Sequence, residues 1–235
     1  MQAKHLIKRH RFILLFAVLV FFFVLIPLLH HLREAVYPAM PPLLEGILFI
    51  LVLAAVMISV SESRRGHFFT LALGVPAALL GLMHLAAPSD LVDLMHHLFA
   101  AGFLSSAMMV ILRYLFVNQR VTLDMVFASL CVYLLLGVLW ALAYSALSIL
   151  NPAAFYSTLP GNAAPVLRIG QGGKAAVLYF SFSTLTTLGY GDIVPVSPLA
   201  RMLTSVEAIT GQLYLTVLVA RLVGLHITES LSQRS

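Results

Sequence analysis

The chain has 235 residues, of which 61% are hydrophobic and only 10% are charged. A soluble domain of average composition is about half apolar and about a quarter charged, so these proportions exclude an ordinary soluble protein and indicate an integral membrane protein. The net charge of +5 does not indicate nucleic-acid binding, because basic residues in membrane proteins mainly report topology. The single cysteine, Cys131, lies in an apolar stretch, so no disulfide is expected within the chain.

Six apolar segments predict six transmembrane helices of an all-α protein. The first follows a basic run, and its long apolar core without a cleavage site favours an uncleaved span over a signal peptide. The polar loop from His30 to Pro42 contains Pro38, Pro41 and Pro42, which cannot continue a helix. Pro76 is expected to kink the third span. Thr122 or Asp124 could cap the fifth. The predicted spans cover about residues 12–29, 43–60, 68–87, 91–117, 123–150 and 199–225.

The basic residues fit a layout in which both termini are cytoplasmic. Ten would lie inside and four outside, as the positive-inside rule requires. The connection between the fifth and sixth spans would then face outward, in the plasma membrane. The inner group is Lys4, Lys8, Arg9, Arg11, Arg64, Arg65, Arg113, Arg120, Arg221 and Arg234, and the outer group is Arg33, Arg168, Lys174 and Arg201.

The segment 174–186 between the last two spans is too short to cross a bilayer, at roughly 20 Å as a helix. It is followed by Leu188-Gly189-Tyr190-Gly191, and irregular backbone at membrane depth is tolerated only where protein buries it or where it lines a water-filled path. These features predict a re-entrant loop that enters as a half-helix, with its carbonyl end favouring a cation, and returns as an extended strand.

The residues of that strand suit a site for a dehydrated cation. Glycine tolerates left-handed backbone angles, so Gly189 and Gly191 would let the carbonyls of Leu188, Gly189 and Tyr190 face one axis. Thr187 would add a carbonyl and a hydroxyl at the inner end. The expected ligand is a permeant ion rather than a cofactor.

The run Thr186-Thr187-Leu188-Gly189-Tyr190-Gly191-Asp192 closely resembles the signature of potassium channels, in which backbone carbonyls replace the hydration shell of the ion. Leu188 replaces the usual valine, which should leave the carbonyl unaffected. The resemblance covers about residues 123–225. It implies K⁺ sites at Thr187, Leu188, Gly189 and Tyr190, and four identical subunits around one axis.

The resemblance also suggests supporting roles for residues around this filter. Gly211 falls at the usual hinge of the pore-lining helix, and Gln212 could face the cavity. Tyr179 stands where a tryptophan usually bonds the aspartate, so a Tyr179–Asp192 contact is expected. Ser183 replaces the glutamate of some members, which removes a carboxyl pair and puts the usual filter inactivation in doubt.

Glu207 lies near the middle of the last span, where an ionised carboxylate is costly. One interpretation is hydrogen bonding to pore-helix hydroxyls such as Ser183, Thr184 or Thr186. The other is a functional role in setting the cavity potential or sensing pH.

The predicted domains are a four-helix membrane domain over 1–117, a linker over 118–122, a pore domain over 123–225 and a cytoplasmic tail over 226–235. The fourth span carries only Arg113, with Arg120 beyond it. A voltage sensor needs several basic residues there, so strong voltage gating is not expected. Membrane lipid and a separate cytoplasmic regulator are further possible partners.

Three alternatives remain open. One is a poorly selective cation channel, and another is a regulatory subunit that does not conduct. The third is a membrane redox protein with haem between His84 and His96 or His97, although adjacent histidines face different directions on a helix. Nothing in the sequence indicates an enzyme, since no nucleophile–base set, phosphate-binding loop or metal motif occurs.

Overall fold

The computed structural model describes residues 11–35, 43–60, 64–118, 121–158 and 173–232, and it is mostly helical. The helices are α2 (Arg11–Ala35), α3 (Leu43–Val60), α4 (Arg64–Ala86), α5 (Asp90–Val117), α6 (Leu123–Leu150), α7 (Gly173–Leu185) and α8 (Pro198–Ser232). A small antiparallel sheet pairs β1 (Phe155–Ser157) with β2 (Ile193–Pro195).

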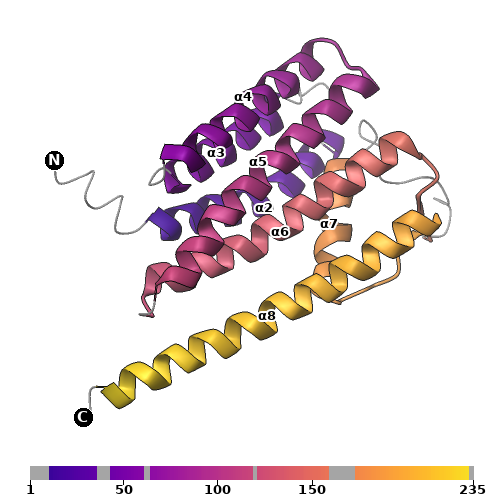
Figure 1. Cartoon of the computed structure of the whole chain (residues 1–235). Helices are drawn as coiled ribbons and strands as arrows, with labels where there is room; N and C mark the ends of the chain where they lie inside the picture. Colours follow the sequence, from indigo (N-terminus) through magenta and orange to yellow (C-terminus); the bar gives the residue numbers. More distant parts are fainter. Residues whose placement is uncertain (1–10, 36–42, 61–63, 119–120, 159–172, 233–235) are drawn as a thin grey trace.

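The helices α2 to α5 form a bundle against one side of α6, and α8 runs along the opposite side (Figure 1). The short helix α7 packs between α6 and α8. The main core is formed by apolar side chains of the bundle and α6, among them Leu19, Val56, Phe103 and Leu135. This arrangement places the segment after α7 at the side of the subunit that faces away from the bundle.

The start of α2 and the end of α5 lie close together, beside the start of α6, and Arg221 of α8 reaches the same place. The Arg11 guanidinium lies 5.0 Å from the centre of the Tyr114 ring, and the Phe12 amide donates to Asp124 Oδ1 over 3.1 Å. Arg221 donates to the Asn118 carbonyl over 3.0 Å. These contacts bring Arg11 and Arg221, both predicted to lie inside, to the same end of the molecule.

Two helices continue past their predicted ends, and α4 begins at Arg64, before the predicted start of the third span at residue 68. The first helix continues past residue 29 to Ala35, and the last continues past residue 225 to Ser232. Both extensions lack proline, and turns of polar helix-forming residues need not stop where the apolar run stops. Therefore the predicted loop from His30 and the predicted tail from residue 226 both begin as helix. Thr122 caps α6 as predicted, with its side chain accepting from the Met125 amide over 3.2 Å.

Four helices are long and apolar enough to cross a membrane within the described residues: Arg11–Leu29, Asp90–Val117, Leu123–Leu150 and Pro198–Ile227. The helices α3 and α4 contribute shorter apolar stretches, Ile50–Ser59 and Thr70–His84. The prediction of a membrane protein is thus supported by four helices, and the six-span layout remains a prediction.

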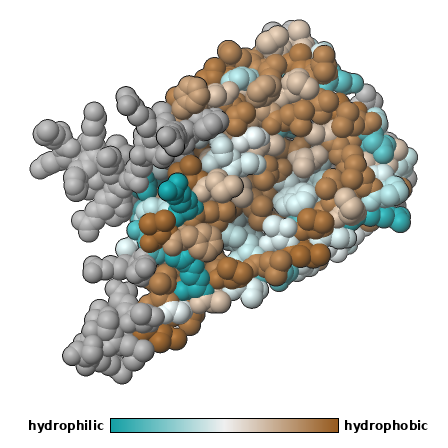
Figure 2. All heavy atoms as spheres, in the orientation of Figure 1, coloured by the Kyte–Doolittle hydropathy of each residue, from teal (hydrophilic) through white to brown (hydrophobic). Residues whose placement is uncertain are grey.

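Apolar side chains cover much of the visible face of the molecule (Figure 2). Along α8, large apolar residues such as Met202, Ile209, Leu213 and Val217 are more than half exposed. One face of a spanning helix can contact lipid, but α8 is exposed on most of its surface. A single subunit therefore leaves α8 largely uncovered by protein.

Candidate functional site

The segment after α7 turns back on the end of that helix. The Thr187 amide donates to the Thr184 carbonyl over 2.9 Å, and the Gly189 amide donates to the Ser183 carbonyl over 3.1 Å. The Tyr133 hydroxyl of α6 lies 3.4 Å from the Leu185 carbonyl. The last carbonyls of a helix have no hydrogen-bond donors within the helix. Here they accept from the following residues and from Tyr133, and these bonds hold the start of the strand against α7.

Every second residue of this strand has a positive φ angle. The values are 59° at Thr187, 56° at Gly189 and 78° at Gly191. In an ordinary extended strand, neighbouring carbonyls point to opposite sides, and a left-handed residue at every second position reverses this alternation. The left-handed angles expected of Gly189 and Gly191 are therefore present, and the presentation of the carbonyls of residues 187–190 towards one axis remains a prediction.

The sequence analysis expected left-handed backbone angles at the two glycines but not at Thr187. A β-branched residue with positive φ is a genuine outlier, and such strain persists only where the surroundings fix it. The Gln212 side chain donates to Thr187 Oγ1 over 3.3 Å. The amide group of Gln212 therefore supports the inner end of the strand from α8.

Tyr179 and Asp192 lie together, as the resemblance suggested. The Tyr179 phenol is hydrogen-bonded to Asp192, and its ring stacks on the Tyr190 ring with centres 6.4 Å apart. Partial burial, then the hydrogen bond and charge of Asp192, raise the pKa of Tyr179 to about 12. The phenol therefore remains a donor at neutral pH and ties α7 to the residue after the strand.

The outer end of the strand is held by a second element that sequence analysis missed. The sequence analysis predicts no paired strands between the last two spans, yet β1 pairs with β2 directly after Asp192. Beyond β1, the Thr158 amide donates to the Asp192 carbonyl over 2.8 Å, and the Thr158 hydroxyl donates to the Gly191 carbonyl over 2.7 Å. The β-forming residues Phe155 and Tyr156 were the available signal.

Gly211 lies where α8 crosses the end of α7. A Cβ atom added there would lie 2.3 Å from the Leu185 carbonyl oxygen, which no packed structure allows. The glycine thus permits close approach of the two helices. The predicted hinge role of Gly211 remains a prediction, whereas its packing role follows from this distance.

The carboxyl group of Glu207 is fully buried and contacts a pore-helix hydroxyl, as one interpretation predicted, but the hydroxyl is not one of the three that were named. Its partners are Tyr144 of α6 and Ser181 of α7, each 2.5 Å away. On a helix, residues 181 and 184 share one side, but Ser181 is the hydroxyl at the level of Glu207, and the Thr186 hydroxyl instead donates to the Phe182 carbonyl over 2.7 Å.

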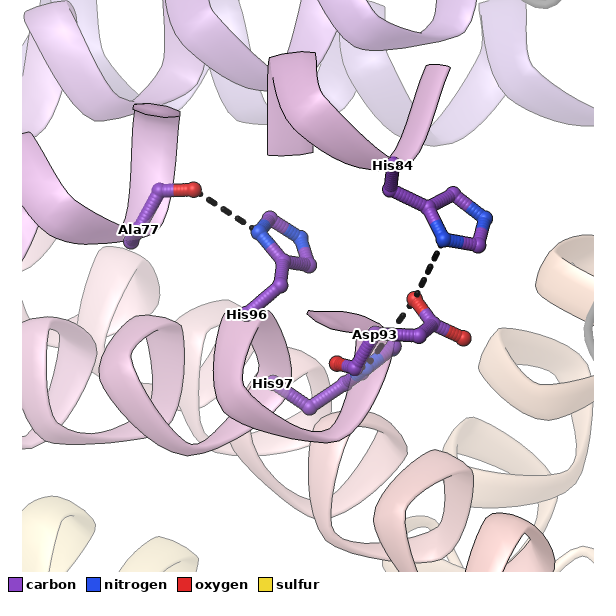
Figure 3. A network of polar contacts seen from close by, with 5 residues as sticks. All are labelled: Ala77, His84, Asp93, His96 and His97. Atoms are coloured by element: carbon purple, nitrogen blue, oxygen red, sulfur yellow. Dashed lines mark hydrogen bonds and ion pairs between the residues drawn. The ribbon is translucent and has the colours of Figure 1, made fainter. Parts of the chain in front are cut away.

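His84 at the end of α4 lies near Asp93, His96 and His97 at the start of α5 (Figure 3). His84 Nδ1 lies 3.8 Å from Asp93 Oδ1, and His97 Nδ1 lies 3.5 Å from the same oxygen. His96 Nδ1 is 2.8 Å from the Ala77 carbonyl. Among the described residues, no group of three or more His, Cys, Asp or Glu has the geometry to hold a metal ion.

These side chains line a cavity that reaches Val177 and Leu178 of α7. Its volume of about 110 Å³ is smaller than the roughly 150 Å³ of a cavity that holds a single benzene. The space as it stands is too small to enclose a porphyrin, and haem between His84 and His96 or His97 remains an untested alternative.

Comparison with known proteins supports an ion-channel segment. Residues 165–226 match the family described as "Ion channel". The chain is 35% identical over 89 residues to the two pore potassium channel c of Oryza sativa subsp. japonica, which is 36% of this chain and 18% of that protein. It is also 35% identical over 85 residues to the inward rectifier potassium channel Kirbac3.1 of Paramagnetospirillum magnetotacticum, again 36% of this chain and 24% of that protein.

The matched segments thus span about a fifth to a quarter of these two relatives. No solved structure matches the chain significantly. Together, the matches point to a potassium-channel type of protein rather than an enzyme. The family match over residues 165–226 includes the segment that turns back after α7.

Proposed function

We propose that this chain is one subunit of a homotetrameric channel that conducts K⁺ passively and selectively across the plasma membrane. The carbonyls of Thr187, Leu188, Gly189 and Tyr190 would replace the water shell of the ion, with the Thr187 hydroxyl at the inner end. The observation that carries this proposal is the positive φ at Thr187, Gly189 and Gly191, because that alternation serves no purpose in an ordinary turn.

The strand is open to its surroundings in a single subunit. Residues 186–191 are all exposed, and Leu188 and Tyr190 are 55% and 69% exposed. Bare backbone carbonyls at membrane depth need partners, because irregular backbone is tolerated there only where protein buries it or where it lines a water-filled path. Four copies around an axis would cover this backbone and surround the ion, with the exposed apolar face of α8 contributing to the contacts between copies.

The surrounding helices fit this role. The proposed layout has six spans with both termini cytoplasmic, the filter near the extracellular face and lipid around the outer helices. Within the described part of α5, Arg113 is the single Lys or Arg side chain. We therefore infer that the first four helices do not act as a strong voltage sensor, and that any regulator acts by another route.

A flux assay on the purified chain in liposomes tests the proposal. Potassium-loaded liposomes should exchange K⁺ when the wild-type chain is present. The variant Gly189→Asp should abolish the flux, because it adds a fixed negative charge beside the carbonyls at a position where glycine adopts positive φ at no steric cost. Equal flux from both proteins, or none from correctly assembled wild type, would contradict the proposal.

A further inference from the structure

Three short oxygen–oxygen contacts form a network at Glu207, two of them to its carboxyl group and one from Ser181 onward to Gly137. The Tyr144 hydroxyl is 2.5 Å from Glu207 Oε2, and the Ser181 hydroxyl is 2.5 Å from Glu207 Oε1. The same Ser181 hydroxyl is 2.8 Å from the Gly137 carbonyl. Oxygen atoms approach this closely when a hydrogen atom lies between them, so the network calls for three protons.

The two hydroxyl groups supply only two of these protons. Tyrosine and serine each carry a single O–H group, and a backbone carbonyl carries none. If the Glu207 carboxyl is ionised, it accepts from Tyr144 and Ser181, and the contact between Ser181 and the Gly137 carbonyl has no hydrogen. Two oxygens with facing lone pairs would then be held 2.8 Å apart.

A neutral carboxyl group completes the network. Its own O–H donates to Ser181 Oγ, Ser181 donates to the Gly137 carbonyl, and Tyr144 donates to Oε2. Each of the three contacts then contains one proton, and each acceptor receives one bond. Tyr144 is also hydrogen-bonded to Thr204 of α8, but this does not change the count at Ser181, which has one proton for two contacts. Both contacts of Ser181 contain a proton only when Glu207 supplies one of them.

The surroundings of Glu207 agree with a neutral group. Glu207, Tyr144 and Ser181 are all 0% exposed, and burying a charge without an opposite charge is costly. Within the described residues, Glu207 forms no ion pair, and the titratable groups that interact with it are Tyr144 and Tyr133 of α6. The helix α7 contributes the hydroxyl of Ser181.

We propose that Glu207 is a positioning residue which, as a protonated acid, joins the outer helix α6, the pore helix α7 and the inner helix α8 behind the filter. The bond from Ser181 to Gly137 fastens α7 to α6 at a point where the helices are already close, since a Cβ at Gly137 would lie 2.3 Å from the Phe182 ring. Ser181 lies six positions before Thr187, so this junction fixes the helix from which the filter starts. The effect on ion flux rests on the proposed function, whereas the protonation does not.

Infrared spectroscopy of the purified chain in lipid tests the protonation directly. A protonated carboxyl group has a carbonyl stretching band that is separate from carboxylate bands. We expect this band at neutral pH in the wild type, and its loss in Glu207→Gln. The control Asp124→Asn changes a carboxyl group that accepts from the Phe12 amide, and it should leave the band in place. Identical spectra for wild type and Glu207→Gln would overturn the proposal.

Flux measurements test the positioning role. The amide of Glu207→Gln can donate to Ser181 and accept from Tyr144 without ionising, so we expect flux within about twofold of wild type and no loss at alkaline pH, where the wild type should decline. Glu207→Leu removes the acceptor of the buried Tyr144 hydroxyl and the donor to Ser181, and it should lower flux roughly tenfold.

Two results would overturn the positioning role: Glu207→Gln losing flux as Glu207→Leu does, or an equal alkaline decline in wild type and Glu207→Gln. If Glu207→Leu fails to assemble, the comparison of wild type with Glu207→Gln still decides. If the wild type itself carries no K⁺, the proposed function fails, and the infrared band still reports the proton.

Discussion

The Thr158 hydroxyl donates a 2.7 Å hydrogen bond to the Gly191 carbonyl, across 33 positions of sequence. Its backbone amide also donates to Asp192, so one residue holds both positions at the outer end of the filter. Together with the Tyr179–Asp192 bond, this fixes the filter from two directions. The outer end is therefore held by contacts within a single subunit.

Thr158→Val should weaken the outer end of the filter. Valine keeps the shape of threonine but cannot donate to the Gly191 carbonyl, and the loss of one such bond is worth about 1 kcal/mol, or roughly fivefold in an equilibrium. We expect increased Na⁺ permeability relative to K⁺ in the reconstituted channel. Thr158→Ser keeps the hydroxyl and should behave as wild type. Equal permeability ratios for valine, serine and wild type would show that this bond has no part in the filter.

Gly211→Ala should disrupt the pore domain, because the new methyl group would lie 2.3 Å from the Leu185 carbonyl. The expected cost is about 1–3 kcal/mol, as for other overpacked contacts, and it should appear as a lower melting temperature of the assembled protein. Gly224→Ala is the matched control on the same helix, since nothing lies within 4 Å of a Cβ there. A similar melting temperature for both variants would contradict this account of Gly211.

Tyr179→Phe should release Asp192 and shorten the time for which the channel remains conductive. The phenylalanine ring can still stack on Tyr190, so the variant isolates the hydrogen bond. Tyr156→Phe serves as a control within β1. Sustained currents in Tyr179→Phe that match both wild type and control would contradict a supporting role for this bond.

The same bond predicts a response to alkaline pH. Because the pKa of Tyr179 is raised above the usual tyrosine value to about 12, the protonated phenol is favoured in the folded state. Its contribution to stability is complete below pH 10 and is lost as the pH rises through about 12. Alkaline unfolding of the wild type and Tyr179→Phe should therefore converge in this window. A stability difference that persists unchanged above it would argue against the bond.

Conductance should depend only weakly on voltage. Each unit charge that crosses the membrane field supplies about 2.3 kcal/mol per 100 mV, and α5 offers Arg113 alone among its described Lys and Arg positions. Replacing Arg113 with Gln should leave the shape of the conductance–voltage curve unchanged in single-channel recordings. A steep curve that becomes shallow in Arg113→Gln would show that the charge acts as a sensor.

Much of this organisation can be predicted from sequence because it depends on local patterns. The apolar run of α6 gives its bounds correctly, and Thr122 signals its start. Gly189 and Gly191 indicate positive φ angles, which most other residues rarely adopt. These features need no knowledge of which segments meet in space.

The contacts between distant segments could not be predicted in the same way. Glu207 has several hydroxyls within plausible reach on α7, and only the packing of three helices selects Ser181 and Tyr144. Thr158 lies in a segment without a clear pattern, so its bond to Gly191 depends on the pairing of β1 with β2. The close contact of Gly211 with Leu185 likewise depends on the angle at which α8 crosses α7.

The most direct test of the central claim is the reversal potential of the purified channel in a planar bilayer with K⁺ on one side and Na⁺ on the other. If the backbone carbonyls of residues 187–190 replace the hydration shell of K⁺, the reversal potential should lie close to the potassium equilibrium potential. A reversal potential near zero, which would show that Na⁺ passes as readily as K⁺, would contradict the account.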